Sequence, residues 1–140
     1  MTTADVAYID SSALLKLVSS EGESAALRRE LGQWSRLASS ALSVTEVTRA
    51  VLRAAPSLMP VASALLATID LVAVTRARLN EAALLQPPLL RTLDALHLAS
   101  ARAIGPNLGA VVTYDRSMAA VARFYGMPVL SPGSRAMRGI

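Results

Sequence analysis

Two short apolar runs, each ended by an aspartate, place the strongest constraint on how this 140-residue chain can fold. The first is VAYI (6–9), followed by Asp10, and the second is GAVVTY (109–114), followed by Asp115. Runs of this length that are rich in β-branched and apolar residues are typical of buried strands. A helical pattern follows each run, and this favours a parallel sheet whose strands are connected by helices.

Strands and helices alternate along the rest of the sequence. Strands are predicted over 6–9, 36–42, 70–75, 109–115 and 127–133. Helices are predicted over 11–20, 24–34, 43–54, 55–69, 76–86, 91–105 and 116–126. A serine is expected to cap the first helix, Ser43 the third and Thr92 the sixth. The alternation predicts one three-layer α/β/α domain over residues 1–140, with a central, mostly parallel sheet of about five strands and a tail that frays from about residue 133.

The composition limits which cellular compartment and which kinds of catalytic or metal-binding site fit this chain. The absence of cysteine excludes disulfides, thiol catalysis and thiolate metal sites. The longest uncharged stretch, between Arg53 and Asp70, is short for a membrane span and contains two prolines, and no secretory signal is visible, so we predict a cytoplasmic protein. The net charge of +4 is carried almost entirely by arginine, which fits an RNA partner, although a GC-rich genome produces the same bias.

Four of the ten acidic residues lie in strongly apolar or strand-end surroundings: Asp10, Glu46, Asp94 and Asp115. Because the carboxyl ends of parallel strands meet at one edge of a sheet, Asp10 and Asp115 are expected to lie together there, beside the two helix starts that carry the other acids. Each acid also has a purely structural explanation. Asp10 and Asp115 can cap a helix or form a turn. Glu46 fits a capping box with Ser43, and Asp94 fits the positive end of a helix dipole.

Carboxylates that lie within about 4–6 Å of one another repel unless a cation neutralises them or some take up protons. Hard divalent ions prefer oxygen ligands. A set of four acids without cysteine, in a chain with one histidine, therefore favours Mg²⁺ or Mn²⁺ over zinc. Such an ion activates a water molecule and stabilises charge on a phosphate, which is the chemistry of a nuclease.

Two hydroxyl side chains are predicted to support the acids. Ser11 follows Asp10, and Thr113 points to the same side of its strand as Asp115, where its hydroxyl can orient the acid or a metal-bound water. His97 can act as a ligand or proton shuttle, but packing within its helix explains it more simply. Four basic residues close to the acids in sequence can contact RNA phosphates or simply pair with acids: Lys16, Arg49, Arg91 and Arg116.

The segments that carry the four acids resemble those of the PIN-domain ribonucleases, and specifically the VapC toxins of bacterial toxin–antitoxin pairs. In family order they are YIDSSALLKL (8–17), SALSVTEVTRA (40–50), RTLDALHLASA (91–101) and VVTYDRSMAAVARFYGMPVLSPG (111–133). The resemblance implies a PIN-like fold. It also implies that the catalytic and metal-binding residues are Asp10, Glu46, Asp94 and Asp115, with Thr113 as a polar helper.

The resemblance further implies what such a protein does and what it binds. It implies a toxin that is an Mg²⁺- or Mn²⁺-dependent endoribonuclease, which hydrolyses RNA phosphodiester bonds with a metal-activated water held by the four carboxylates. It implies structured RNA such as tRNA or rRNA as substrate. It also implies a homodimer, and a small VapB-like antitoxin that forms a heterotetramer or larger complex with it.

The sequence leaves two other functions open. In an Asp-nucleophile phosphotransferase, Asp10 would form a phospho-aspartate. Haloacid-dehalogenase-like enzymes resemble this opening segment, but they have a second Asp where this chain has Ser12. In a non-catalytic module that binds a protein or RNA, the four acids would only cap helices.

Overall fold

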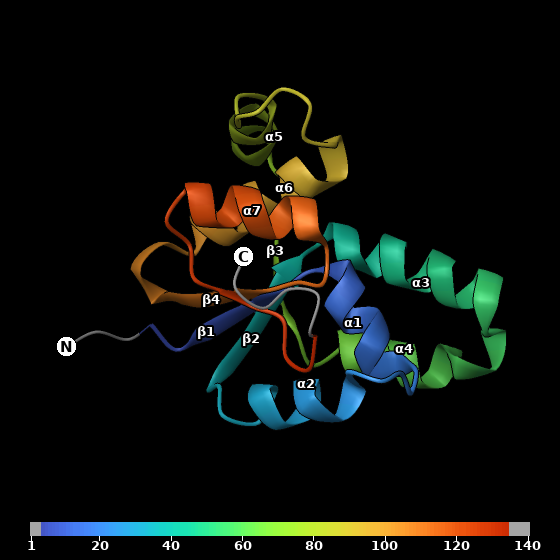
Figure 1. Cartoon of the computed structure of the whole chain (residues 1–140). Helices are drawn as coiled ribbons and strands as arrows, with labels where there is room; N and C mark the ends of the chain where they lie inside the picture. Colours follow the sequence, from blue (N-terminus) through green and yellow to red (C-terminus); the bar gives the residue numbers. More distant parts are fainter. Residues whose placement is uncertain (1–3, 135–140) are drawn as a thin grey trace.

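Five parallel strands form one sheet at the centre of the molecule, and the computed structural model describes residues 4–134 (Figure 1). The strand order is β3-β2-β1-β4-β5, so the first strand of the chain lies in the middle of the sheet. The strands are β1 (Val6–Ile9), β2 (Arg36–Ser40), β3 (Asp70–Val72), β4 (Leu108–Val112) and β5 (Val129–Leu130). All of these pairings are parallel, which confirms the predicted sheet.

Helices cover both faces of this sheet. One face is packed by α1 (Ser11–Val18), α2 (Ser24–Leu31), α3 (Leu42–Ala54) and α4 (Met59–Leu66), with the short 3₁₀ helix η1 (Pro56–Leu58) between the last two. The other face is packed by α5 (Arg76–Ala83), α6 (Thr92–Ala103) and α7 (Arg116–Phe124), and a second 3₁₀ helix, η2 (Gly105–Asn107), precedes β4. The predicted three-layer α/β/α architecture is confirmed.

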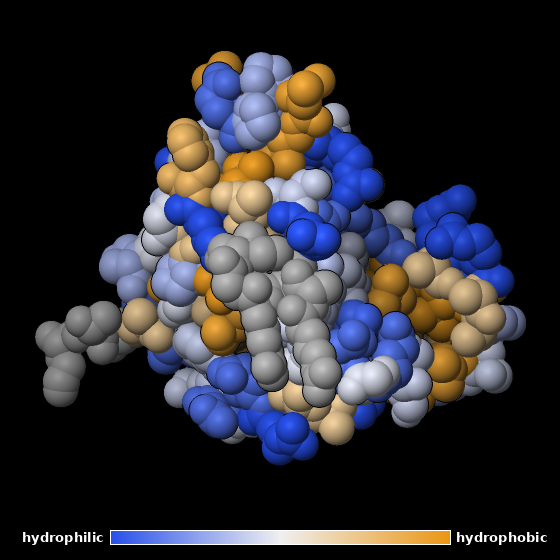
Figure 2. Space-filling view, in the orientation of Figure 1, coloured by the Kyte–Doolittle hydropathy of each residue, from blue (hydrophilic) through white to orange (hydrophobic). Residues whose placement is uncertain are grey.

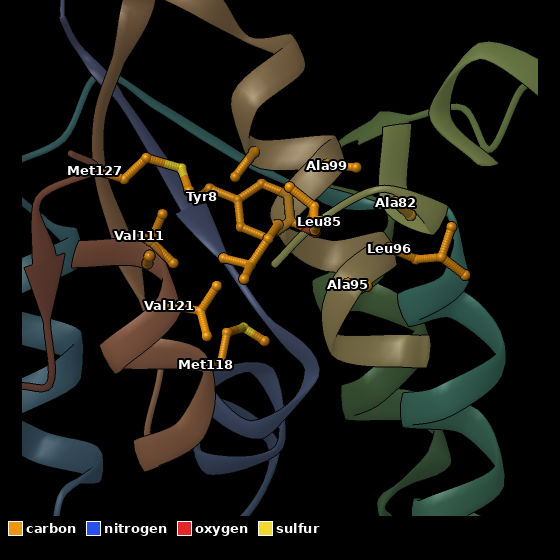
Figure 3. Packing of buried hydrophobic residues seen from close by; sticks show 13 residues of the cluster. Tyr8, Ala82, Leu85, Ala95, Leu96, Ala99, Val111, Met118, Val121 and Met127 are labelled. Atoms are coloured by element: carbon orange, nitrogen blue, oxygen red, sulfur yellow. The ribbon is translucent and has the colours of Figure 1, made fainter. Parts of the chain in front are cut away.

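The central strand β1 shows why the sequence is apolar at every position of this run. Ala7 and Ile9 pack with the helices of the first layer, whereas Tyr8 packs with α5, α6 and α7. Figure 3 shows Tyr8 in the middle of the apolar cluster between the sheet and these three helices, among side chains from α6 and α7. A parallel strand that is buried on both faces cannot alternate with polar residues, so it reads as a continuous apolar run.

The start of α3 differs from the prediction. The helix begins at Leu42, whose N–H donates to the hydroxyl of Ser40 at 3.1 Å. The predicted N-cap Ser43 therefore lies inside the helix, and its side chain makes no capping hydrogen bond. The side chain of Val44 is exposed, and the buried positions of this helix are Ser43, Val47 and Val51.

Three other predictions about element ends are also corrected. Thr92 is the first residue of α6 rather than its cap, and no side chain caps that helix. The strand predicted over 70–75 ends at Val72, because the side chain of Thr75 caps α5 by accepting a hydrogen bond from the N–H of Arg78 at 3.2 Å. The helix predicted over 55–69 is divided into η1 and α4.

Within residues 4–134, no helix is long and apolar enough to cross a membrane. The predicted fraying of the tail from about residue 133 concerns residues that lie almost entirely outside the described part of the chain.

Gly109 in β4 leaves no room for a side chain. A Cβ atom there would overlap the ring of Trp34 and approach the carbonyl oxygen of Ala4 to 2.6 Å. Gly109→Ala is therefore expected to lower the free energy of unfolding by about 1–3 kcal/mol, measured by urea denaturation. Gly22→Ala is the matched control, because nothing lies within 4 Å of a Cβ atom at that position. Equal losses of stability in the two variants would contradict this account of Gly109.

Candidate active site

The four predicted acids line a single pocket of about 360 Å³ at the carboxyl edge of the sheet. Each comes from a different part of the chain: Asp10 follows β1, Glu46 lies on α3, Asp94 lies in the first turn of α6, and Asp115 precedes α7. The expectation that the sheet topology brings these acids together is met, because all of them contribute to the lining of this one pocket.

Asp10 is only 2% exposed and is held by three donors. Its Oδ1 accepts hydrogen bonds from the N–H of Ala13 at 3.0 Å and the hydroxyl of Ser12 at 2.7 Å, and its Oδ2 accepts one from the hydroxyl of Thr113 at 2.5 Å. Asp10 thus caps α1 itself, where a serine was predicted. Burial raises the pKa of the Asp10 carboxyl, and the hydrogen bonds from Thr113 and Ser12 oppose this rise.

Two hydroxyl groups connect the end of β1 to the segment that follows β4. Thr113 donates to Asp10 and accepts a hydrogen bond from the backbone N–H of Asp115 at 3.0 Å. Ser12 donates to Asp10 and accepts one from the backbone N–H of Tyr114 at 3.1 Å. The contact predicted for Ser11 is thus made by Ser12, and Ser11 lines the pocket without a hydrogen bond to Asp10.

Asp94 and Asp115 hold one guanidinium group between them. The Nη2 atom of Arg91 lies 2.6 Å from Oδ2 of Asp115 and 3.0 Å from Oδ2 of Asp94. The other carboxylate oxygen of Asp115 accepts from the N–H of Met118 at 2.9 Å and so caps α7. Burial and then the neighbouring charge of Asp115 raise the pKa of the Asp94 carboxyl, while Arg91 lowers it. The two carboxylates are close enough together to bind the same cation.

Glu46 is held by the only histidine of the sequence. The Nε2 atom of His97 lies 2.7 Å from Oε1 of Glu46, and the Nδ1 atom lies 2.6 Å from the hydroxyl of Tyr8. Burial, followed by the charge of Asp10, raises the pKa of Tyr8 well above its usual value, so its hydroxyl is protonated. Because α3 begins at Leu42, Glu46 lies beyond the first turn, and the capping-box explanation of this acid is wrong.

The donor set of this pocket consists of carboxylate and hydroxyl oxygens with one imidazole, which fits a hard divalent cation. Within residues 4–134, no three side chains of Asp, Glu or His already converge closely enough to hold a metal ion. Asp94 and Asp115 share the guanidinium group of Arg91, and this contact shows where two of the acids can act together. Holding a metal ion with three or four acids would require the side chains to rearrange.

The basic residues singled out in the sequence differ in their positions. Arg91 lines the pocket, and its side chain is 72% exposed. Lys16 instead forms ion pairs with Glu21 at 3.3 Å and with Glu23 at 3.0 Å. Arg49 on α3 and Arg116 on α7 are exposed and do not line the pocket. Arg91 is therefore the residue among these four that is placed to contact a ligand of the pocket.

Sequence reasoning missed Ser12 and Tyr8 as parts of the site. A weak signal existed for each of them. Ser12 is a hydroxyl residue two positions after an aspartate that can cap a helix. Tyr8 carries the one polar group in a run predicted to be buried, and a buried tyrosine hydroxyl usually has a hydrogen-bond partner. The spacing of Ser12 points to its bond with Asp10, but no local signal identifies its second partner, the N–H of Tyr114. The partner of Tyr8, His97, likewise comes from a distant part of the chain.

Comparisons with known proteins identify the family of this chain. A model of the PIN domain family matches residues 7–128. The chain is 45% identical over 125 residues to Ribonuclease VapC46 of Mycobacterium tuberculosis (strain ATCC 25618 / H37Rv). This match covers 89% of the present chain and 96% of the relative. It is 36% identical over 130 residues to Ribonuclease VapC35 of the same strain, with 90% and 96% covered. It is 39% identical over 132 residues to Ribonuclease VapC47 of M. tuberculosis (strain CDC 1551 / Oshkosh), with 91% and 97% covered. The chain therefore belongs to the PIN-domain family and, within it, to the VapC proteins.

Proposed function

We propose that this chain is the toxin of a type II toxin–antitoxin pair and acts as an endoribonuclease that uses Mg²⁺ or Mn²⁺. The names of its relatives support ribonuclease activity. The observation that carries the proposal is the pocket, where four separate elements contribute one acid each: Asp10, Glu46, Asp94 and Asp115. A single phosphodiester-cleaving site accounts for all four acids at once.

The side chains of the pocket would differ in their roles: two carboxylates would bind the metal ion, and two others are already held in a fixed orientation. Asp94 and Asp115 would hold the divalent ion, because they already share the charge of one guanidinium group. Asp10 is fixed by its three donors and Glu46 by His97, so both carboxylates are oriented before a ligand arrives. When bound, the ion supplies an activated water and stabilises negative charge on the scissile phosphate.

Arg91 would bind the RNA backbone at the mouth of the pocket. Its guanidinium group is exposed and can form paired hydrogen bonds with phosphate oxygens. A divalent ion held by Asp94 and Asp115 would compete with Arg91 for the same carboxylates, and this competition would free the guanidinium group for the phosphate. One residue would thus serve both the acids and the substrate.

The two alternative functions fit the pocket less well. As a nucleophile, Asp10 would have to attack from a 2% exposed position with both oxygens already accepting hydrogen bonds. As a module with purely structural acids, the chain would use Glu46 as a cap, but that residue lies beyond the first turn of its helix. Asp10 and Asp115 do cap helices, yet both also line the pocket.

The proposal includes partners and a location. Structured RNA such as tRNA or rRNA would be the substrate, a VapB-like antitoxin would bind and inhibit the protein in a heterotetramer or larger complex, and the toxin itself would be a cytoplasmic homodimer. Figure 2 shows apolar surface around α5 and where α3 and α4 lie side by side. Leu84 and Leu89, which follow α5, are 79% and 93% exposed. Exposed apolar residues of this kind support protein partners.

The function is tested by RNA cleavage with controlled metal content. Purified protein is incubated with total RNA after treatment with EDTA, and Mg²⁺ or Mn²⁺ is then restored. We expect no cleavage in EDTA and discrete new RNA ends with either ion, which sequencing of those ends would locate. Equal cleavage with and without the chelator would rule out the metal-dependent mechanism, and intact RNA in every sample would rule out the ribonuclease.

A further inference from the structure

His97 contacts a site acid through one ring nitrogen and the protein interior through the other. It is 1% exposed on α6, with Nε2 at 2.7 Å from Glu46 and Nδ1 at 2.6 Å from the hydroxyl of Tyr8. The rings of Tyr8 and His97 meet edge to face at 5.9 Å between centroids. Both nitrogen atoms of the ring are therefore committed, and the ring is fixed in the core.

We propose that His97 is the positioning residue for Glu46, and that Tyr8 fixes the tautomer in which His97 can do this. An ionised carboxylate only accepts hydrogen bonds, so Glu46 requires a proton on Nε2. A neutral imidazole with that proton has a lone pair on Nδ1, which accepts the hydroxyl proton of Tyr8. In a neutral imidazole, one tautomer therefore satisfies both contacts, with its proton on the nitrogen that faces the pocket.

The placement of these three residues links separate parts of the site. Tyr8 lies on β1, and Asp10 directly follows this strand, so one short segment carries both a site acid and the group that orients His97. His97 lies three positions after Asp94, so α6 also carries both an acid and the group that holds another acid. Glu46 has several rotatable bonds, and without this contact its side chain would sample other rotamers. A histidine that only filled space would not need its outer nitrogen to end on a pocket carboxylate.

The tautomer can be measured directly, because the sequence contains one histidine and an untagged protein labelled with ¹⁵N-histidine gives the signals of one ring. Two-bond ¹H–¹⁵N correlation spectra at pH 8 are expected to show a protonated Nε2 and an unprotonated Nδ1. A ring that carries its proton on Nδ1 would overturn the inference. This measurement needs neither metal nor RNA, so its outcome is independent of the proposed function.

Positioning of Glu46 is tested by Mn²⁺ binding, and this part rests on the proposed function. His97→Leu has a similar volume but no donor, whereas His97→Gln retains an N–H that can reach Glu46. We expect the dissociation constant for Mn²⁺, measured from the free ion by electron paramagnetic resonance, to rise about 10–100-fold in His97→Leu and only a few-fold in His97→Gln. Thermal melts of both variants report whether each is folded.

A double-mutant cycle separates positioning from a general loss of structure. If His97 acts through Glu46, adding His97→Leu to Glu46→Ala should cause no further loss of Mn²⁺ affinity. An equal loss in both backgrounds would overturn the inference, and so would wild-type affinity in folded His97→Leu. Tyr8→Phe offers a second route if the leucine variant does not fold: it is expected to weaken Mn²⁺ binding in the same direction, and unchanged binding together with an unchanged tautomer would exclude the role of Tyr8. If the wild-type protein binds no Mn²⁺, the proposed function fails, while the tautomer measurement still decides the hydrogen-bond pattern.

Discussion

Asp94→Asn is expected to reduce the rate of RNA cleavage at least about 10²-fold, because a divalent ion contributes several kcal/mol of transition-state stabilisation and Asp94 is one of the two carboxylates that already share a cation. The amide has the same shape as the carboxylate, and Asp115 remains to pair with Arg91. The loss should therefore appear in the cleavage rate rather than in the folding of the protein, and single-turnover assays with excess enzyme would measure it.

Asp70→Asn provides a matched control for this experiment. Asp70 is an exposed carboxylate at the start of the edge strand β3, and its partner is Arg36 at 3.5 Å. It does not line the pocket, so cleavage by this variant should equal that of the wild type. If both variants were equally active, Asp94 would have no catalytic role, and if both were equally inactive, the assay would be reporting overall charge.

Thr113→Val is expected to cause the second large effect. The hydroxyl of Thr113 is fully buried, donates to Asp10 and accepts from the N–H of Asp115. Valine has the same shape but leaves these buried groups without that partner, which should lower the free energy of unfolding by about 1–3 kcal/mol. Thr113→Ser keeps the hydroxyl and should keep both cleavage and most of the stability. Urea denaturation of the two variants under identical conditions gives the comparison, and a serine variant that loses as much stability as the valine variant would contradict this role of the hydroxyl.

The same pair of variants predicts a change in pH dependence. Burial raises the pKa of Asp10, and the hydrogen bond from Thr113 lowers it. Removal of the hydroxyl should therefore raise this pKa further, so that a higher pH is needed to ionise Asp10. The acidic limb of the pH–rate profile is expected to move to higher pH in Thr113→Val and to stay in place in Thr113→Ser. A shift to lower pH in the valine variant would contradict the assignment.

The sequence predicts the sheet well because its central strands are buried on both faces. Such strands must be apolar throughout, and residues 6–9 and 108–112 show this plainly. The edge strand β3 is shorter than its apolar pattern suggests, and Leu71 within it is 41% exposed. An edge strand has a neighbour on one side only, so local sequence does not determine where its pairing stops.

Helix starts were harder to predict because several residues compete for each cap. Three serines, Ser39, Ser40 and Ser43, surround the start of α3, and any of them matches the preference for a cap. In the structure Ser40 accepts from the first turn, while Ser39 and Ser43 bond to each other at 2.6 Å. The choice depends on β1, since Ser39 also donates to the carbonyl of Ile9 at 2.6 Å. That contact is formed by the tertiary structure and has no signal in the local sequence.

The acids of the candidate site were predictable as residues, whereas their partners were not. Strand ends and helix starts place Asp10 and Asp115 at one sheet edge by topology alone. The pairing of Glu46 with His97 spans 51 positions, and that of Thr113 with Asp10 spans 103. No spacing rule within a single helix or strand reaches so far. Prediction from the sequence therefore identified four acids that line one pocket, and the structure was needed to show what orients them.

The central claim is that carboxylates of the candidate active site, among them Asp94 and Asp115, share one divalent ion in the pocket that they line. The most direct measurement is anomalous diffraction at the manganese absorption edge from crystals of the protein equilibrated with Mn²⁺. The account predicts a single strong peak in the pocket, about 2.0–2.2 Å from oxygen atoms of Asp94 and Asp115, with Arg91 moved away from the two carboxylates. A pocket without a peak at saturating Mn²⁺, or a peak held only by carboxylates elsewhere on the surface, would contradict it.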